Sequence, residues 1–325
     1  MIIIDGSYGE GGGQLLRYSV ALAALLGREI KVVNIRAKRS PPGLRPQHLA
    51  AVKTIAQLVG ADVEGLTVGS MEVAIKPGKR PKGGAFNIDI GTAGSITLLL
   101  QAVLPVLASA EGGVNLRVRG GTDVNWSPPI NYFQHVLLPI LHKFGLRAQL
   151  KLLQRGFYPQ GGGLVEVFVE PSYPLQGVNI AEPGRLVKIE GVSYAANLPR
   201  HVAERQAAAA YEVIRSEGYS NWLEEITIDT ETPAIGTGSG IVLWATYEHS
   251  VVGADALGER GKRAEVVGRE AAQKLLNVLR SNVPVDPHAL DNLIIYMALA
   301  RGPSLVVSNE LSSHAETAVW LCSKL

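Results

Sequence analysis

The sequence predicts an α/β protein built from a repeated unit. Runs of β-branched residues bounded by Gly and Pro alternate with segments whose apolar residues recur every three or four positions. The order βαβαββ occurs twice before Pro171, with a period of about 85 residues. Because solenoid repeats are shorter, about 20 to 50 residues, this period indicates duplication of a small α/β unit.

Each of the two units should contain six elements, with a glycine turn before its first helix and a proline near the start of its second. In the first unit we expect a strand at Ile2–Ile4, a helix at Gln14–Leu26, a strand at Ile30–Arg36, a helix at Pro46–Val59, and strands at Val63–Val68 and Met71–Ile75. In the second we expect a strand at Phe86–Ile90, a helix at Ser95–Ala108, a strand at Val114–Val118, a helix at Pro129–Phe144, and strands at Ala148–Leu153 and Leu164–Val169.

A third unit is expected to begin with a strand at Leu186–Val192 and then to be interrupted by an inserted domain. The interruption should hold a helix at His201–Arg215, strands at Glu225–Asp229 and Ile241–Tyr247, a Gly-rich loop at Gly253–Lys262 and a helix at Glu265–Leu279. The unit should resume with a helix at Ala289–Ala300, a strand at Leu305–Val307 and a helix at Ser313–Cys322. We therefore expect a large domain of residues 1–184 and 281–325, with residues 185–280 inserted. The last two strands of a third unit are missing, because the sequence stops at Leu325.

The composition is that of a globular protein, with 46% hydrophobic and 18% charged residues. A net charge of +2 excludes a broadly basic nucleic-acid coat but permits a local basic groove. The single cysteine, Cys322, excludes an internal disulfide and a thiolate zinc site. No signal peptide is recognised, and the longest apolar stretch, Ile96–Ala110, is too short to span a bilayer. The expected location is the cytoplasm.

The first residues combine a strand, a glycine-dense loop and a helix. Five glycines between Asp5 and Gln14 permit positive φ angles and close approach of a ligand to the backbone. A helix that begins behind such a loop offers free N–H groups to an anion. Glu10 is placed to hold a cation, and Arg17 to reach an anion. The spacing fits neither standard phosphate loop, so a purely structural turn remains the alternative.

A stiff basic loop follows the second predicted strand. Arg36, Lys38, Arg39 and Arg45 fall within ten residues and are interleaved with proline and glycine. Arginine binds phosphate through bidentate forks, so converging side chains here indicate an anion site. A solvated basic loop is the alternative, but its proline content argues against it.

One of the seven histidines is a candidate nucleophile. His314 lies at the start of the last predicted helix, where a neutral imidazole can attack while a neighbouring polar group orients its other nitrogen. The others suit structural or surface roles, apart from His288, which is considered below: His48, His135, His142, His201 and His249.

Taken together, the sequence resembles the RNA 3'-terminal phosphate cyclases over nearly its whole length. The resemblance is carried by several segments in the right order: DGSYGEGGGQLLR, IRAKRSPPGLRPQH, GTAGSITLLLQAVLP, RGGTDVNWSPP, RGFYPQGGG, PRHVAER, HALDN and SSHAET. It implies three βαβαββ repeats like the C-terminal domain of translation initiation factor three, with a smaller domain inserted in the third.

The resemblance also implies a ligase reaction that uses ATP. A histidine attacks the α-phosphorus of ATP and releases pyrophosphate, leaving a histidine-AMP phosphoramidate. AMP then passes to an RNA 3'-phosphate, and the adjacent 2'-hydroxyl displaces AMP to give a 2',3'-cyclic phosphate. A divalent cation, Mg²⁺ or Mn²⁺, would offset the phosphate charge. A homodimer is left open.

Residue matches give these roles to positions of this chain. His314 matches the nucleophile, and Glu10 matches the metal-binding carboxylate. Arg17, Arg36, Arg39 and Gln47 match positions around the RNA phosphate end. The positions that match ATP contacts are Gln101, Pro128, His288, Ala289, Leu290, Asp291 and Asn292. His288 stands where some members stack an aromatic residue on adenine, and Pro128 would face it.

Two departures and two rival functions accompany this resemblance. Relatives often carry further strands after the nucleophile helix, and the residues after His314 differ from the bacterial pattern. One rival is a non-catalytic relative that assists ribosomal RNA processing, but such relatives lack the histidine. The other is a carboxyvinyl transferase, which has more repeats, a longer chain and no histidine nucleophile.

Overall fold

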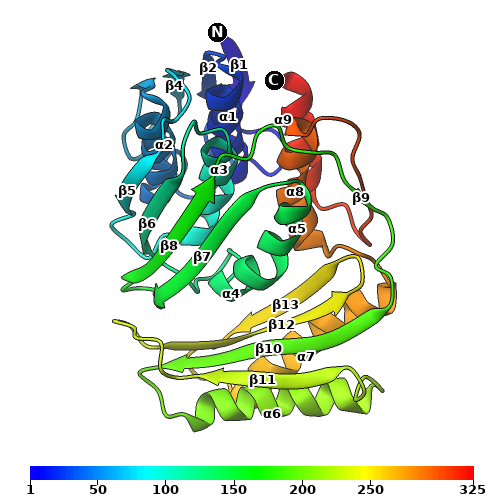
Figure 1. The fold of residues 1–325 in the computed structure, drawn as a ribbon. Coiled ribbons are helices and arrows are strands. Elements are labelled where there is room, and N and C mark those ends of the chain that lie inside the picture. The colour runs from blue at the N-terminus through cyan, green and yellow to red at the C-terminus, as the bar shows by residue number, and fades with distance from the viewer.

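The computed structural model describes residues 1–325, and it confirms an α/β protein with several sheets (Figure 1). The first sheet has the order β1-β2-β4-β3. Its elements are β1 (Ile2–Asp5), α1 (Gly13–Leu26), β2 (Ile30–Val33), α2 (Pro46–Val59), β3 (Asp62–Glu64) and β4 (Val73–Lys76). Strand β1 runs parallel to β2, whereas β4 is antiparallel to both β2 and β3.

The second sheet, β5-β6-β8-β7, has the same pattern of strand order and direction as the first. Its segment contains β5 (Gly84–Asp89), α3 (Ile96–Ala108), β6 (Val114–Gly120), α4 (Ile130–Tyr132), the π-helix η1 (Phe133–Leu137), α5 (Leu138–Lys143), β7 (Arg147–Gln154) and β8 (Gly163–Glu170). The helix expected at 129–144 is thus interrupted by a π turn just before Pro139, which has no N–H to donate to the preceding turn.

A third sheet, β11-β10-β12-β13, lies below the other two in Figure 1, with α6 and α7 on its far side. Its elements are β10 (Leu186–Ala196), α6 (His201–Ser216), β11 (Leu223–Asp229), β12 (Gly238–Tyr247), β13 (Val251–Leu257) and α7 (Ala264–Ser281). A short parallel pair, β9 (Asn179–Ile180) and β14 (Leu305–Val306), brackets this sheet in the sequence. The remaining helices are α8 (Pro287–Leu299) and α9 (Ser313–Lys324).

The structure differs from two sequence expectations in this region. The strand expected at Leu186–Val192 lies in β10, which pairs with β11 and β12, so it groups with the elements expected in the insertion. Gly253–Lys262 is not all loop, because its first residues belong to β13. Gly253 is needed there for packing: a Cβ on it would lie 2.4 Å from Val136 Cγ2.

The third sheet is buried on both faces, and alternate residues of its strands enter different cores. On β12, Val242 and Trp244 pack into the large core shared with the first two sheets, whereas Ile241, Leu243 and Ala245 pack with α6 and α7. This division follows the two-residue period of a strand. The third sheet is therefore packed against the rest of the protein rather than tethered to it.

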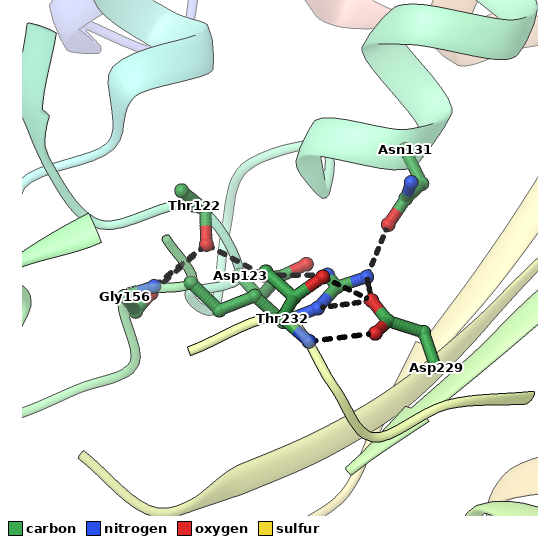
Figure 2. Close-up of polar contacts among 7 residues, drawn as sticks. Thr122, Asp123, Asn131, Gly156, Asp229 and Thr232 are labelled. Atoms are coloured by element: carbon green, nitrogen blue, oxygen red, sulfur yellow. Dashed lines mark hydrogen bonds and ion pairs between the residues drawn. The ribbon is translucent and has the colours of Figure 1, made fainter. Parts of the chain in front are cut away.

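A buried ion network joins the second and third sheets (Figure 2). The Arg155 guanidinium is 1% exposed and lies 3.2 Å from Asp123 Oδ2 and 2.8 Å from Asp229 Oδ2. It also donates to Asn131 Oδ1 at 2.9 Å and stacks over the Tyr194 ring at 3.8 Å. Since Asp123 precedes α4 and Asp229 ends β11, one side chain holds two parts of the molecule together.

The charge of Arg155 favours the ionised form of the Asp229 carboxyl. Burial alone would raise the pKa of the Asp229 carboxyl. The charge and hydrogen bonds of Arg155, together with hydrogen bonds from the Thr232 N–H and hydroxyl, outweigh burial and lower this pKa.

None of the helices combines the length and the hydropathy needed to cross a lipid bilayer.

Arg155→Met should lower the free energy of unfolding by about 3 to 5 kcal/mol, because it leaves two carboxylates beside the former guanidinium without their cation. Urea denaturation at neutral pH measures this change. The matched control is Arg205→Met, whose ion pair with Glu265 joins α6 to α7 at the surface, where water screens the charges, so the stability should hardly change. Equal losses in the two variants would contradict a structural role for the buried network.

Candidate functional site

Three segments that are far apart in the sequence meet at the Glu10 carboxylate. His314 Nε2 lies 3.4 Å from Glu10 Oε2, and an Arg39 Nη2 donates to the same oxygen at 3.2 Å. The Ser313 hydroxyl donates to Glu10 Oε1. The contact joins the glycine loop, the basic loop and the start of α9, so the candidate nucleophile and the candidate metal ligand are neighbours.

The position of His314 is fixed by the start of α9. Ser312 caps the helix by accepting from the Ala315 N–H at 3.0 Å, and its hydroxyl donates to Asp291. One turn later, Thr317 packs on Gly9, where φ is +58° and a Cβ would lie 2.3 Å from Thr317 Oγ1. Glycine is required at this contact. His314 thus lies in the first turn of a helix, whose positive end favours a bound anion.

A cluster of cations lies around the start of α1 and α2. Arg17 is 5% exposed, yet it forms no ion pair and donates no hydrogen bond to any protein group, and its Nε is among the buried polar atoms without a partner. Burial lowers the pKa of Arg17 to about 10, so the side chain stays charged at neutral pH. A buried guanidinium without a carboxylate is costly and indicates a site for an external anion.

His48, assigned only a structural role from sequence, belongs to this cluster. Burial lowers the pKa of His48 to about 3, with the nearby charges of Arg17, Arg36 and Arg45 adding to the effect. Its Nδ1 accepts from the Arg45 backbone N–H at 3.1 Å, so in the neutral ring the proton lies on Nε2. Nε2 faces the start of α1, since a Cβ on Gly13 would lie 2.1 Å from it. A neutral donor is thus held among three arginines.

The segment before and within α8 is held by Asp286, which sequence reasoning missed. Its Oδ1 accepts from the Ala289 N–H at 3.0 Å and from the Tyr132 hydroxyl at 2.6 Å, and its Oδ2 accepts from the Gly253 N–H at 3.1 Å. This one carboxylate caps α8 and ties it to both α4 and β13. An aspartate directly before a proline was the available signal, because that pair often begins a helix.

Within α8, the residues matched to the nucleotide sort into exposed and buried groups. His288 is exposed, whereas Ala289 and Leu290 are core residues whose side chains face inward. Burial raises the pKa of Asp291 despite the hydrogen bond from Ser312 and the nearby charges of His314 and His288. Its backbone carbonyl accepts from Tyr18 on α1 at 3.4 Å. Asn292 bonds to the His288 carbonyl at 2.7 Å, and its Oδ1 has no partner.

The other matched positions lie around α3. Gln101 is 7% exposed and stands one turn after Thr97, whose hydroxyl donates to the Pro128 carbonyl at 2.8 Å. Pro105 lacks the N–H that would bond to the Gln101 carbonyl. Gln47 approaches the loop before α3, where a Cβ on Gly94 would lie 3.3 Å from Gln47 Cβ. No hydrogen bond or ion pair joins Gln101 to Glu10 or His314.

The donor set does not form a closed metal centre. Nowhere do three His, Cys, Asp or Glu side chains converge as metal ligands. Mg²⁺, however, is often held by one or two carboxylates together with substrate phosphates. Glu10 is half-buried, with Oε2 facing His314. It fits a cation carried mainly by nucleotide phosphates.

The fold and the site describe an α/β protein in which a histidine and a carboxylate meet at one helix N-terminus, and a buried arginine without a partner lies in the first turns of another. The family model for RNA 3'-terminal phosphate cyclase matches residues 8–325. Proteins named RNA 3'-terminal phosphate cyclase from Pyrobaculum neutrophilum and Hyperthermus butylicus are each 51% identical to this chain, covering 98% and 100% of it and 91% of each relative. The relative from Pyrobaculum aerophilum, which bears the same name, is 50% identical over 98% of this chain and 90% of its own length. The chain belongs to this family of enzymes.

We expect the His48 ring to stay neutral down to about pH 4, because its pKa in the folded protein is about 3. The unfolded chain takes up a proton below about pH 6.5, so stability should be lost progressively as pH falls from about 6.5 toward about 3. At pH 4.5 the loss is roughly 2 to 3 kcal/mol relative to pH 7. Histidine NMR titration and urea unfolding of wild type and His48→Gln at both pH values test this. A ring that titrates near pH 6.5, or an unchanged pH slope in the variant, would contradict it.

Proposed function

We propose that this protein converts an RNA 3'-terminal phosphate into a 2',3'-cyclic phosphodiester with ATP, through a covalent histidine-AMP intermediate. The observation that supports this most strongly is the meeting of His314, Glu10 and Arg39 at the start of α9, in a protein that also buries the Arg17 guanidinium without a partner. Family membership supports the same reaction class.

In the first step, the neutral imidazole of His314 attacks the α-phosphorus of ATP, an N–P bond forms and pyrophosphate leaves. The nitrogen that faces Glu10 is Nε2, which suits it for attack on a phosphate placed over the start of α9. A divalent cation held by Glu10 would offset the charge of the ATP phosphates. The free N–H groups of the first turn favour the same anion.

In the second step, an oxygen of the RNA 3'-phosphate attacks the phosphorus of the AMP, the N–P bond breaks and an RNA-adenylate forms. The vicinal 2'-hydroxyl then attacks the RNA phosphorus, loses its proton and expels AMP. We assign the RNA phosphate to Arg17, Arg36 and Gln47, together with the Nε2–H of His48. Arg39 contacts Glu10, so it would serve both steps.

We further propose that α8 and its surroundings bind the adenosine of ATP. His288 is exposed at the start of α8 and would stack on adenine opposite Pro128, while Gln101 and Asn292 retain polar atoms for hydrogen bonding. Ala289 and Leu290 would contribute backbone rather than side-chain contacts, because their side chains lie in the core.

We also propose that the fold consists of three repeats like the C-terminal domain of translation initiation factor three, with β10 to α7 inserted into the third. The equal order and direction of strands in the first two sheets support the duplication. The parallel pairing of β9 with β14 repeats that of β1 with β2, which supports a shortened third copy.

A cytoplasmic location is proposed from the lone cysteine, Cys322.

His314→Ala should abolish transfer of label from α-labelled ATP to the protein, because no other nucleophile replaces the imidazole, while stability should change by under about 1 kcal/mol at this exposed position. A denaturing gel after incubation with Mg²⁺ or Mn²⁺ detects the adduct, which should be acid-labile and alkali-stable. His201→Ala at the exposed start of α6 is the control and should keep the label. Label on the His314 variant would refute the assignment, and no label on wild type would favour the non-catalytic ribosomal RNA processing role.

Arg17→Met should leave stability unchanged or raise it, because it removes a buried cation that no protein group neutralises. Adenylation of the enzyme should persist, whereas KM for RNA bearing a 3'-phosphate should rise about 10- to 100-fold, since a shielded charged hydrogen bond is worth about 1.5 to 3 kcal/mol. Thermal unfolding and steady-state cyclisation measure both effects. Arg28→Met, just beyond the other end of α1, is the control. An equal loss of adenylation would place Arg17 at ATP instead.

A further inference from the structure

Two large aromatic side chains are displayed to solvent by neighbouring loops. Trp126 is 99% exposed and Tyr158 is 78% exposed. Trp126 also has φ of +66°, a left-handed conformation that is rare for a bulky residue. Trp126 therefore combines a strained backbone conformation with a fully exposed indole, and both features are unfavourable for the folded protein alone. Such outliers cluster at binding sites.

The two loops are fixed side by side. The N–H groups of Thr122 and Asp123 both donate to the Gly156 carbonyl, at 2.9 and 3.2 Å, and the Gly156 N–H donates back to Thr122 Oγ1 at 2.8 Å. Asp123 and Phe157 form a parallel bridge. Figure 2 shows the contacts between Thr122 and Gly156, and the ion pair of Asp123 with Arg155, the residue before Gly156, ties the two loops together again. Trp126 and Tyr158 thus follow a rigid base, three residues and one residue beyond the bridge.

The same loops continue to the cationic cluster. A Cβ on Gly161 would lie 2.8 Å from the Cα of Ala93, so the Tyr158 loop touches the loop before α3. That loop in turn touches Gln47 through Gly94. Gln47 is at the start of α2, next to Arg45 and His48. A chain of contacts between neighbouring loops therefore links the proposed RNA phosphate site to the loop that carries Tyr158.

The charge around Trp126 suits an uncharged group better than a phosphate. Trp126 lines an open pocket that is also lined by Asp255, Glu259 and Glu270. The two lysines of this pocket, Lys262 and Lys274, already pair with Glu270. Carboxylates would repel a phosphate here, whereas a nucleobase can stack on an indole without being repelled.

We propose that Trp126 and Tyr158 form a stacking platform for unpaired bases of single-stranded RNA upstream of the 3'-phosphate. The inference rests on the proposed function, because the occupant is the RNA whose phosphate the arginines hold. Aromatic platforms next to a cationic groove are how proteins bind single strands without reading their sequence. The platform would make affinity depend on the bases that precede the terminus.

The test is direct binding, which needs no turnover. The probe is a fluorescent, unstructured oligoribonucleotide with a 3'-phosphate, compared at fixed salt with the same strand carrying abasic upstream residues and with a mononucleotide 3'-phosphate. Trp126→Ala and Tyr158→Ala should each weaken binding of the intact strand about 5- to 150-fold. Neither variant should alter binding of the abasic strand or the mononucleotide. Trp126→Phe and Tyr158→Phe should keep most of the affinity, and Tyr211→Ala, 41% exposed on α6, should keep all of it.

Several outcomes would overturn the platform. Unchanged binding of the intact strand by both alanine variants would do so, as would equal weakening for intact and abasic strands. A raised KM for ATP in the adenylation assay would place Trp126 at the adenine instead. If wild type bound the strand but formed neither an adduct nor a cyclic end, the proposed function would fail while the binding data still decided the platform.

Discussion

The buried charge of Arg155 is the constraint on which the arrangement of the second and third sheets depends. A guanidinium with 1% exposure is tolerated only because Asp123, Asp229 and Asn131 surround it. These acceptors come from the loop after β6, from β11 and from α4. Folding of the second sheet and docking of the third are therefore coupled. The same contacts fix the position of Asp123, where the loop that carries Trp126 begins.

Asp286 fixes the position of α8, the helix that we propose to bind the nucleotide. Its two oxygens accept from α8, Tyr132 and Gly253, so the start of α8 is positioned by the same two bodies that Arg155 joins. A displacement of the third sheet would remove a partner from both carboxylate networks at once. The third sheet therefore contributes to the geometry of the candidate site, even though His314, Glu10, Arg17, Arg36 and Arg39 all lie outside it.

Periodicity was enough to predict most helices, since α2 matches its expected bounds and α1 differs by one residue. It failed where a local signal was weak. Strand β9 has only two residues. Strand β13 contains a glycine and an aspartate, which are unfavourable in strands, so its formation depends on packing against η1 and α7. Sequence motifs predicted Glu10, Arg39 and His314, which meet. They could not identify His48 or Asp286, because the role of each depends on partners from other segments.

Arg155 and Arg17 are both buried arginines, but their surroundings indicate different roles. Arg155 has carboxylates, an amide and an aromatic ring around it, so its charge is already compensated and its role is structural. Arg17 has a similar degree of burial, but its side chain forms no ion pair, and it lies beside the neutral ring of His48. The desolvation cost of Arg17 is recovered only when an anion arrives. Burial without compensation is therefore the physical basis for placing the RNA phosphate there, and it separates binding arginines from structural ones.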